Sequence, residues 1–310
     1  MRRTLVIGLA LAALLAGCQR EQDPQAENRS TCLNANAAAQ PRVDACTALI
    51  DAGVLTQAER ADVLAARGVA HRSAGQVTAG LRDFEAALRV NERQADALEG
   101  RAAILIASGQ LDAAEPMIER LIASGERLDQ AHLMEGDIAL GRGDAVSAAA
   151  AYDQAIASNG DLALAYARRA RAKDRLGDHD GARADYDAAI SKDGALAEAR
   201  AGRCWLNLVQ KANLEQARND AEAAVAAEPR LVEAQLCRGV LQLQGGEWAN
   251  ARAAFEVVLS VEPGNPVALF GHGVARRRSG DGAGVEDMNQ ARDFDRHIGE
   301  TFDELGVETY

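Results

Sequence analysis

The sequence predicts an all-α protein built from about seven stacked helix–turn–helix repeats. Three observations support this fold class: turn residues recur about every 34 positions, small and bulky residues keep a constant phase within each unit, and the composition favours helices. Apolar residues make up 48% of the 310 residues but aromatic residues only 4%. We therefore expect an interior made mainly of Ala, Leu and Val, which suits closely packed helices.

The period is clearest in a column of turn residues, which is glycine in every unit but the fifth. Its members are Gly75, Gly109, Gly143, Gly177, Ala212, Gly246 and Gly280, separated by 34 residues except for the step of 35 that ends at Ala212. The extra residue lies between Cys204 and Ala212, and it predicts a longer or bulged first helix in the fifth repeat.

Three further columns keep the same phase. Small residues precede the turn at Gly68, Ala102, Gly136, Ala170, Cys204, Gly239 and Gly273. A second column, five residues after the turn, is also mostly small: Gly80, Ala114, Ala148, Ala182, Ala217, Ala251 and Val285. Bulky residues follow at Phe84, Ile118, Tyr152, Tyr186 and Phe255, with Ala221 in the fifth repeat. Small side chains are needed where two helices cross closely, because a larger group would force them apart.

These columns resemble the tetratricopeptide repeat, and the resemblance covers about residues 61–294. It implies a right-handed α-solenoid, or superhelix, whose first helices line a concave groove. The expected repeats are 61–94, 95–128, 129–162, 163–196, 197–231, 232–265 and 266–294. Residues 32–60 are expected to form an N-terminal capping segment, with a helix from about Arg42 to Ala52 and a capping box at Thr56 and Glu59. Residues 295–310 are expected to form a C-terminal cap or tail.

The first eighteen residues predict export and lipidation. Met1-Arg2-Arg3 precedes an apolar run of about eleven residues, too short to span a bilayer but typical of a secretory signal peptide. Leu15-Ala16-Gly17-Cys18 resembles a bacterial lipobox, which implies cleavage after residue 17 and acylation (palmitate) of Cys18. Gln19 stands where the inner-membrane retention signal has Asp, which implies an outer-membrane lipoprotein that faces the periplasm. Residues 18–31 are then expected to be the lipidated cysteine and a disordered tether.

The four remaining cysteines leave alternatives open. Cys32 and Cys46 favour a disulfide over free thiols, because export reaches an oxidising compartment and the short loop would be stabilised by roughly 3 kcal/mol. Cys204 and Cys237 lie on first helices of neighbouring repeats, where either a bond or two small buried side chains would fit.

The sequence offers no catalytic, metal or cofactor site. None of the five histidines has ligand spacing, and neither a G-x-S-x-G elbow nor an S-x-x-K motif occurs. Gly280–Gly284, Arg142-Gly143-Asp144 and Asp178-His179-Asp180 resemble functional motifs, but each falls on a repeat's turn. The net charge of −12 argues against nucleic acid as a ligand, and membrane contact is expected only through the N-terminal lipid.

The predicted function is therefore a non-enzymatic scaffold that holds a protein or peptide partner in the groove. The resemblance places these residues in it: Ile106, Leu133, Leu140, Arg171, Trp205, Leu208, Leu236, Val240, Leu243, Phe270, Val274 and Arg277. An exposed apolar groove of this extent typically binds a helix or an extended peptide. Two other outcomes are open: some of these side chains pack between helices, or the chain's own C-terminus fills the groove. The alternative functions are a self-assembling envelope protein and an assembly factor for a pilus, secretin or cell-wall enzyme complex.

Overall fold

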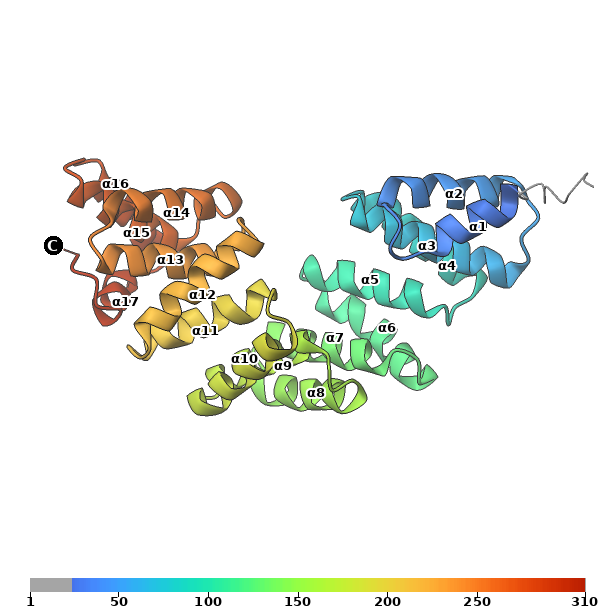
Figure 1. Cartoon of the computed structure of the whole chain (residues 1–310), viewed down its shortest axis with the longest axis horizontal. Helices are drawn as coiled ribbons and strands as arrows, with labels where there is room; N and C mark the ends of the chain where they lie inside the picture. The colour runs from blue at the N-terminus through green and yellow to red at the C-terminus, as the bar shows by residue number, and fades with distance from the viewer. Residues whose placement is uncertain (1–23, 310) are drawn as a thin grey trace, which may run out of the picture. The chain divides into compact units, whose positions relative to one another are not determined.

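The computed structural model describes residues 24–309, and within them it contains seventeen α-helices and no strand (Figure 1). The predicted all-α class is thereby confirmed. The signal peptide and Cys18 lie outside the described residues. The chain divides into two compact units, one up to Ser108 and the other from Gly109 onward, so that the boundary falls inside the second predicted repeat. None of the described helices is long and apolar enough to cross a bilayer.

The first unit holds five of the helices. They are α1 (Pro24–Leu33), α2 (Ala39–Asp51), α3 (Gln57–Ser73), α4 (Val77–Val90) and α5 (Ala95–Ala107). The second unit holds the other twelve. They are α6 (Leu111–Ser124), α7 (Leu128–Gly141), α8 (Ala145–Ser158), α9 (Ala163–Arg175), α10 (His179–Lys192), α11 (Ala197–Val209), α12 (Leu214–Ala227), α13 (Val232–Gln244), α14 (Trp248–Val261), α15 (Pro266–Arg278), α16 (Gly284–Phe294) and α17 (Ile298–Glu304). Helices α3 and α4 form a helix–turn–helix pair in the first unit. The second unit contains five such pairs, α7–α8, α9–α10, α11–α12, α13–α14 and α15–α16.

The segment before the first repeat is folded onto it. Residues 24–33 form α1, so the prediction of a disordered tether is wrong for residues 24–31. A disulfide joins Cys32 to Cys46 of α2, and the Arg29 guanidinium lies 2.8 Å from the Glu59 carboxylate of α3. Composition alone missed this helix because the disulfide and the ion pair stabilise it, not its own apolar surface. The predicted capping box is confirmed: the Thr56 side chain accepts from the Glu59 amide, and Glu59 accepts from the Thr56 amide.

In several repeats a bulky aromatic ring packs against glycine residues of neighbouring helices. In the first unit the Phe84 ring of α4 packs against Gly68 of α3 and Gly100 of α5. In the second unit Phe255 of α14 meets Gly239 and Gly271 in the same way, and a methyl group at Gly239 would lie 2.7 Å from the ring. These rings are fully buried. The predicted interlocking of small and bulky columns is therefore present, with each of these rings shared between two successive first helices.

The extra residue of the fifth repeat lies in the turn, not in the first helix. The first helix, α11, has 13 residues, as α9 and α13 do. The predicted lengthening of this helix is therefore wrong. Instead the turn gains one residue, and Lys211 and Asn213 adopt left-handed backbone conformations with φ near +50°. The turn absorbs the insertion because a longer helix would shift every buried side chain that follows it.

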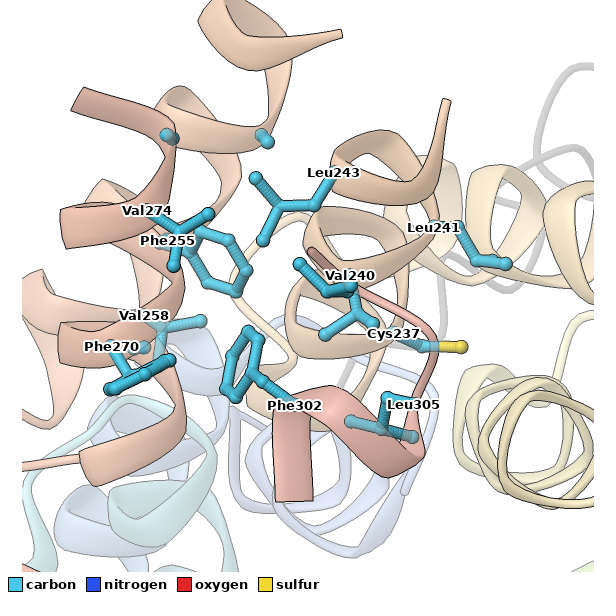
Figure 2. Close-up of a cluster of buried hydrophobic side chains, with 14 of the residues drawn as sticks. Cys237, Val240, Leu241, Leu243, Phe255, Val258, Phe270, Val274, Phe302 and Leu305 are labelled. Atoms are coloured by element: carbon cyan, nitrogen blue, oxygen red, sulfur yellow. The ribbon is translucent and has the colours of Figure 1, made fainter. Parts of the chain in front are cut away.

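The last repeats share one large apolar cluster with the C-terminal segment. Figure 2 shows Phe302 of α17, and Leu305 directly after this helix, beside Val240 of α13 and Phe270 of α15. The ring centroids of Phe270 and Phe302 are 4.8 Å apart. Residues 298–307 therefore cover the apolar side of the last repeats.

The fit between glycine and ring makes a testable prediction. A side chain at Gly136 would overlap the ring of Tyr152, which is fully buried and donates a 2.9 Å hydrogen bond to Asp137. Because the ring cannot move aside, we expect Gly136→Val to lower the free energy of unfolding by about 1–3 kcal/mol, measured by urea denaturation. Gly282→Ala is the matched control, because open space surrounds Gly282. An equal loss of stability in both variants would contradict the role of the ring contact.

Candidate interaction pocket

Most of the predicted groove in the last three repeats is covered by the chain itself. Leu208, Val240, Leu243, Phe270 and Val274 are buried, and all five belong to the cluster that contains the C-terminal segment. The prediction that they line an exposed groove is therefore wrong. Val240 and Phe270 lie beside the segment after α16 (Figure 2), whose buried apolar side chains are Ile298, Phe302, Leu305 and Val307.

Polar contacts hold this C-terminal segment in place. The Gln244 side chain donates a 2.5 Å hydrogen bond to the carbonyl of Leu305. Arg277, which was predicted to face a partner, donates instead to the carbonyl of Thr309 at 3.3 Å, and Arg278 donates to the carbonyl of Glu308 at 2.9 Å. The segment therefore satisfies its own carbonyls with side chains of α13 and α15.

Three other predicted groove residues do not form a common surface. Leu133 and Leu140 of α7 are buried in a cluster around Tyr152, so they pack between helices. Ile106 is half-buried on α5 in the first unit. For Leu133 and Leu140 the prediction of exposure is wrong, because the inner side of α7 is covered by α8 and α9.

The three remaining predicted residues, Arg171, Trp205 and Leu236, meet in one open pocket of about 270 Å³. It lies on the first helices α9, α11 and α13, each of which contributes one of the three. The other lining residues are Ala167, Asp174, Arg175, Tyr186, Glu198, Ala201, Gly202, Leu231, Glu233 and Val267. Apolar residues predominate, and charged groups from α9, α11 and α13 are interspersed among them.

A disulfide ties two walls of the pocket together. Cys204 of α11 is bonded to Cys237 of α13, with the Cα atoms 6.4 Å apart. Both cysteines are fully buried. Cys204 directly precedes the lining residue Trp205, and Cys237 directly follows the lining residue Leu236. Of the two alternatives for these cysteines, the structure contains the bond. It links neighbouring repeats and so limits how far these two walls can separate.

The ring of Tyr186, a residue of the bulky column, lines the pocket. Its ring lies against Gly202 of the next repeat, and only 4% of the residue is exposed. Burial raises the pKa of its hydroxyl well above the usual range, and the nearby carboxylate of Asp174 adds to the rise. The phenol is therefore protonated at neutral pH and can donate a hydrogen bond. It has no hydrogen-bond partner among the described residues.

Most charged residues of the pocket already form an ion pair or a hydrogen bond with a neighbouring residue. Glu198 is held by Arg168 at 3.2 Å, and Asp174 lies 2.8 Å from His179. Arg175 donates to the carbonyl of Leu140 at 3.0 Å. The weakest contact is between Arg171 and Glu233, 3.7 Å apart and each about half exposed, and such pairs contribute little stability. A ligand could therefore rearrange this last pair at small cost.

A ladder of ion pairs, which the repeat pattern did not predict, joins neighbouring repeats within each unit. A basic residue one position before the small column contacts an acidic residue sixteen positions earlier, in the preceding repeat. The pairs are Arg101–Glu85, Arg169–Asp153, Arg203–Asp187 and Arg238–Glu222, at 2.5–3.8 Å. At the equivalent position of the last repeat, His272 lies 3.5 Å from Glu256. The third repeat breaks the ladder, because Glu135 stands at this position opposite Glu119. The spacing of sixteen, repeated in phase, was the signal that could have revealed it.

Basic residues at this position also bind a buried aspartate in their own repeat. The pairs are Arg67–Asp83, Arg169–Asp185 and Arg203–Asp220, with N···O distances of 2.6–2.7 Å. The three aspartates are buried, and hydrogen bonds to Asp220 and then to Asp187 raise the pKa of Arg203. In Arg169 and Arg203 one guanidinium thus joins three helices: its own first helix, the second helix of its repeat, and the second helix of the repeat before.

The motifs that resembled chemical sites have structural roles. Gly143, Gly177 and Gly280 have positive φ angles, which glycine adopts readily in these turns. Asp178 caps α10, because its carboxylate accepts from the Gly181 amide at 3.0 Å. Among residues 24–309, no cluster of three His, Cys, Asp or Glu side chains is arranged to hold a metal ion.

Comparisons with known proteins agree with this architecture. A family model described as tetratricopeptide repeat matches residues 65–132, 104–163, 133–201 and 205–268, more than half of the chain. A structure of the APC/C hetero-tetramer Cut9–Hcn1 is similar over 93% of this chain and 57% of that chain, with 15% identity and a TM-score of 0.66. Two bacterial proteins of this repeat class are also similar. The protein from Parabacteroides merdae has 17% identity over 81% of this chain and 100% of that chain, with a TM-score of 0.53. The thermophilic protein from Thermus thermophilus has 21% identity over 59% and 99%, with a TM-score of 0.52. No curated protein matches the sequence.

The ladder makes a second prediction. Arg203→Met keeps the apolar stem but leaves Asp220, which is 1% exposed, with only Arg200 at 3.3 Å. A buried carboxylate that loses its main partner is costly, so we expect the free energy of unfolding to fall by about 3 kcal/mol. Asp187→Asn removes the exposed partner of the same arginine and should cost less than about 1 kcal/mol. Urea denaturation of both variants checks the difference, and equal losses would contradict the importance of burial.

Proposed function

This chain belongs to the tetratricopeptide-repeat family, and we propose that it is a non-enzymatic scaffold that holds a protein partner in the pocket between α9, α11 and α13. The observation that carries this proposal is the contrast between two parts of one face. Over α13 and α15 the face is covered by the C-terminal segment, whereas around Trp205 and Leu236 it stays open. Partly exposed apolar side chains gathered in a hollow are typical of binding sites.

The pocket has the features of an anchor site for a partner. Trp205 and Leu236 are partly buried, and they pack against the cluster that contains the C-terminal segment. Tryptophan and arginine are enriched among the residues that dominate binding energy, and Arg171 stands at the rim. The Cys204–Cys237 bond restrains two walls before a partner arrives, which lowers the entropic cost of binding.

We further propose that the chain is a lipoprotein of the outer membrane that acts in the periplasm on envelope proteins. The support is the signal-peptide pattern of residues 1–17 followed by Cys18 and Gln19. The two disulfides support an oxidising compartment, because such bonds persist outside the cytosol. An acylated Cys18 would keep the scaffold close to partners in the same envelope.

The pocket can be tested by capture of the partner. After crosslinking in cells, we expect Trp205→Ala and Leu236→Ala to lower recovery of the co-purified partner at least tenfold, because truncation of a central anchor typically costs about 2 kcal/mol or more. Quantitative mass spectrometry of the purified complexes provides the measurement.

Val146→Ala is the control for this experiment. Val146 is apolar and 66% exposed, but it lies on α8 outside the pocket, so its truncation should leave recovery unchanged. Unaltered recovery in both pocket variants would refute the scaffold role of this site.

The lipid anchor has its own test. Cys18→Ser removes the thiol that would carry the acyl chains, so the protein should leave the membrane fraction and lose labelling by a fatty-acid analogue. The wild-type chain, labelled and fractionated in parallel, provides the reference. A variant that stays in the membrane fraction would show that another segment holds it there.

A further inference from the structure

We propose that this pocket recognises a tyrosine side chain of the partner, and that Tyr186 selects tyrosine over phenylalanine by hydrogen bonding to the incoming hydroxyl. This inference rests on the proposed scaffold function, because it names the side chain that the scaffold holds. It assigns a specificity-determining role to a residue that otherwise serves as packing.

The size of the pocket suits one aromatic side chain. Its volume is about 270 Å³, below the range typical of drug-sized ligands. A cavity of about 150 Å³ is enough to hold benzene inside a protein. The pocket therefore accepts a single ring with its linker to the backbone, whereas a small polar residue would leave most of it unfilled.

The walls favour a ring over a charged group. Trp205, Leu236 and Val267 provide apolar contacts, and Trp205 offers a partner for an offset or edge-to-face aromatic pair. The charged residues of the pocket already have partners, so no charge of either sign is left unpaired to attract a charged ligand. A neutral side chain leaves these pairs in place, whereas a charged one would have to compete with them.

The Tyr186 hydroxyl indicates which neutral ring is preferred. No hydrogen bond joins this hydroxyl to residues 24–309, and it is not one of their fully buried unpaired polar atoms, so it reaches the solvent of the pocket. Tyr152 occupies the same position of the preceding repeat, and its hydroxyl donates a 2.9 Å hydrogen bond to Asp137. Phe84 and Phe255 fill this column without a hydroxyl. Packing therefore does not require the oxygen of Tyr186, and the oxygen sits at a pocket that a ligand can enter.

A tyrosine anchor satisfies this hydroxyl, whereas phenylalanine or leucine would bury it without a partner. Burying an unpaired hydroxyl costs free energy, so the difference appears as selectivity. The adjacent part of the same face already holds an aromatic anchor from the chain itself. There Phe302, on the short helix α17, packs on Phe270 of α15, and Trp205 and Leu236 border that cluster.

The test uses two probes that differ by one hydroxyl, N-acetyl-tyrosinamide and N-acetyl-phenylalaninamide. The chain has two tryptophans, so in a Trp248→Phe background Trp205 is the sole tryptophan emitter. Titration of the purified full chain should change Trp205 emission with both probes, with tyrosinamide binding about threefold to tenfold more tightly. Adding Tyr186→Phe should bring the two affinities within about twofold of each other, by weakening tyrosinamide binding alone.

Tyr152→Phe is the matched control. It removes a hydroxyl from the same column outside the pocket, so the preference for tyrosinamide should persist. Thermal melting of each variant confirms folding. Equal affinity of the two probes for the parent chain, persistence of the preference after Tyr186→Phe, or binding of neither probe would each overturn the proposal.

These outcomes are separable from failure of the proposed function. If Trp205→Ala abolishes partner capture but tyrosinamide shows no advantage, the scaffold site stands and tyrosine recognition is wrong. If tyrosinamide binds selectively but partner capture survives both pocket truncations, the pocket is a ligand site and the scaffold proposal is wrong.

Discussion

The contact between a bulky ring and a glycine of a neighbouring helix is the constraint on which the rest of the structure depends. Phe84 and Phe255 each lie against glycines of two successive first helices, which brings those helices close enough for the next repeat to pack. Each repeat buries its apolar surface mainly on its neighbours, and Tyr152 and Tyr186 make the same kind of contact with glycine in the second unit. Stability is then a sum of similar local interfaces, and surface residues are left to vary.

The same logic explains why the two ends of the array are covered. A terminal repeat has an apolar side with no neighbour, and exposing it would favour aggregation. At one end α1 and α2 are folded onto α3 and joined by the Cys32–Cys46 bond. At the other, α17 places Phe302 on Phe270, and arginines of α15 hold the last carbonyls. The open pocket around Trp205 lies where this cover ends, so its exposure follows from the length of the cap.

The ion-pair ladder helps to fix the register between successive repeats, which apolar packing alone would specify less strongly. Arginine suits this role because its planar guanidinium can bind two carboxylates at once, as Arg203 does with Asp220 and Asp187. The buried aspartates contribute little net stability, since their desolvation offsets most of the attraction. Their effect is to make a shifted register costly, because it would leave a buried carboxylate without its arginine. The Cys204–Cys237 bond adds a covalent link between neighbouring repeats beside the pocket.

The sequence by itself determined the all-α class, the period and the interlocking columns. These depend on local spacing and side-chain size, which a single chain displays directly. It also indicated Arg171, Trp205 and Leu236, because first-helix positions can be counted from the small column. Only the tertiary structure decided which groove residues stay exposed. Val240 and Phe270 are covered by a segment distant in sequence, and α1 is stabilised by partners that composition does not reveal. That the Tyr186 hydroxyl faces the pocket without a partner among residues 24–309 also emerged only in three dimensions, because hydrogen bonding depends on every neighbour of an atom and not on its place in a repeat.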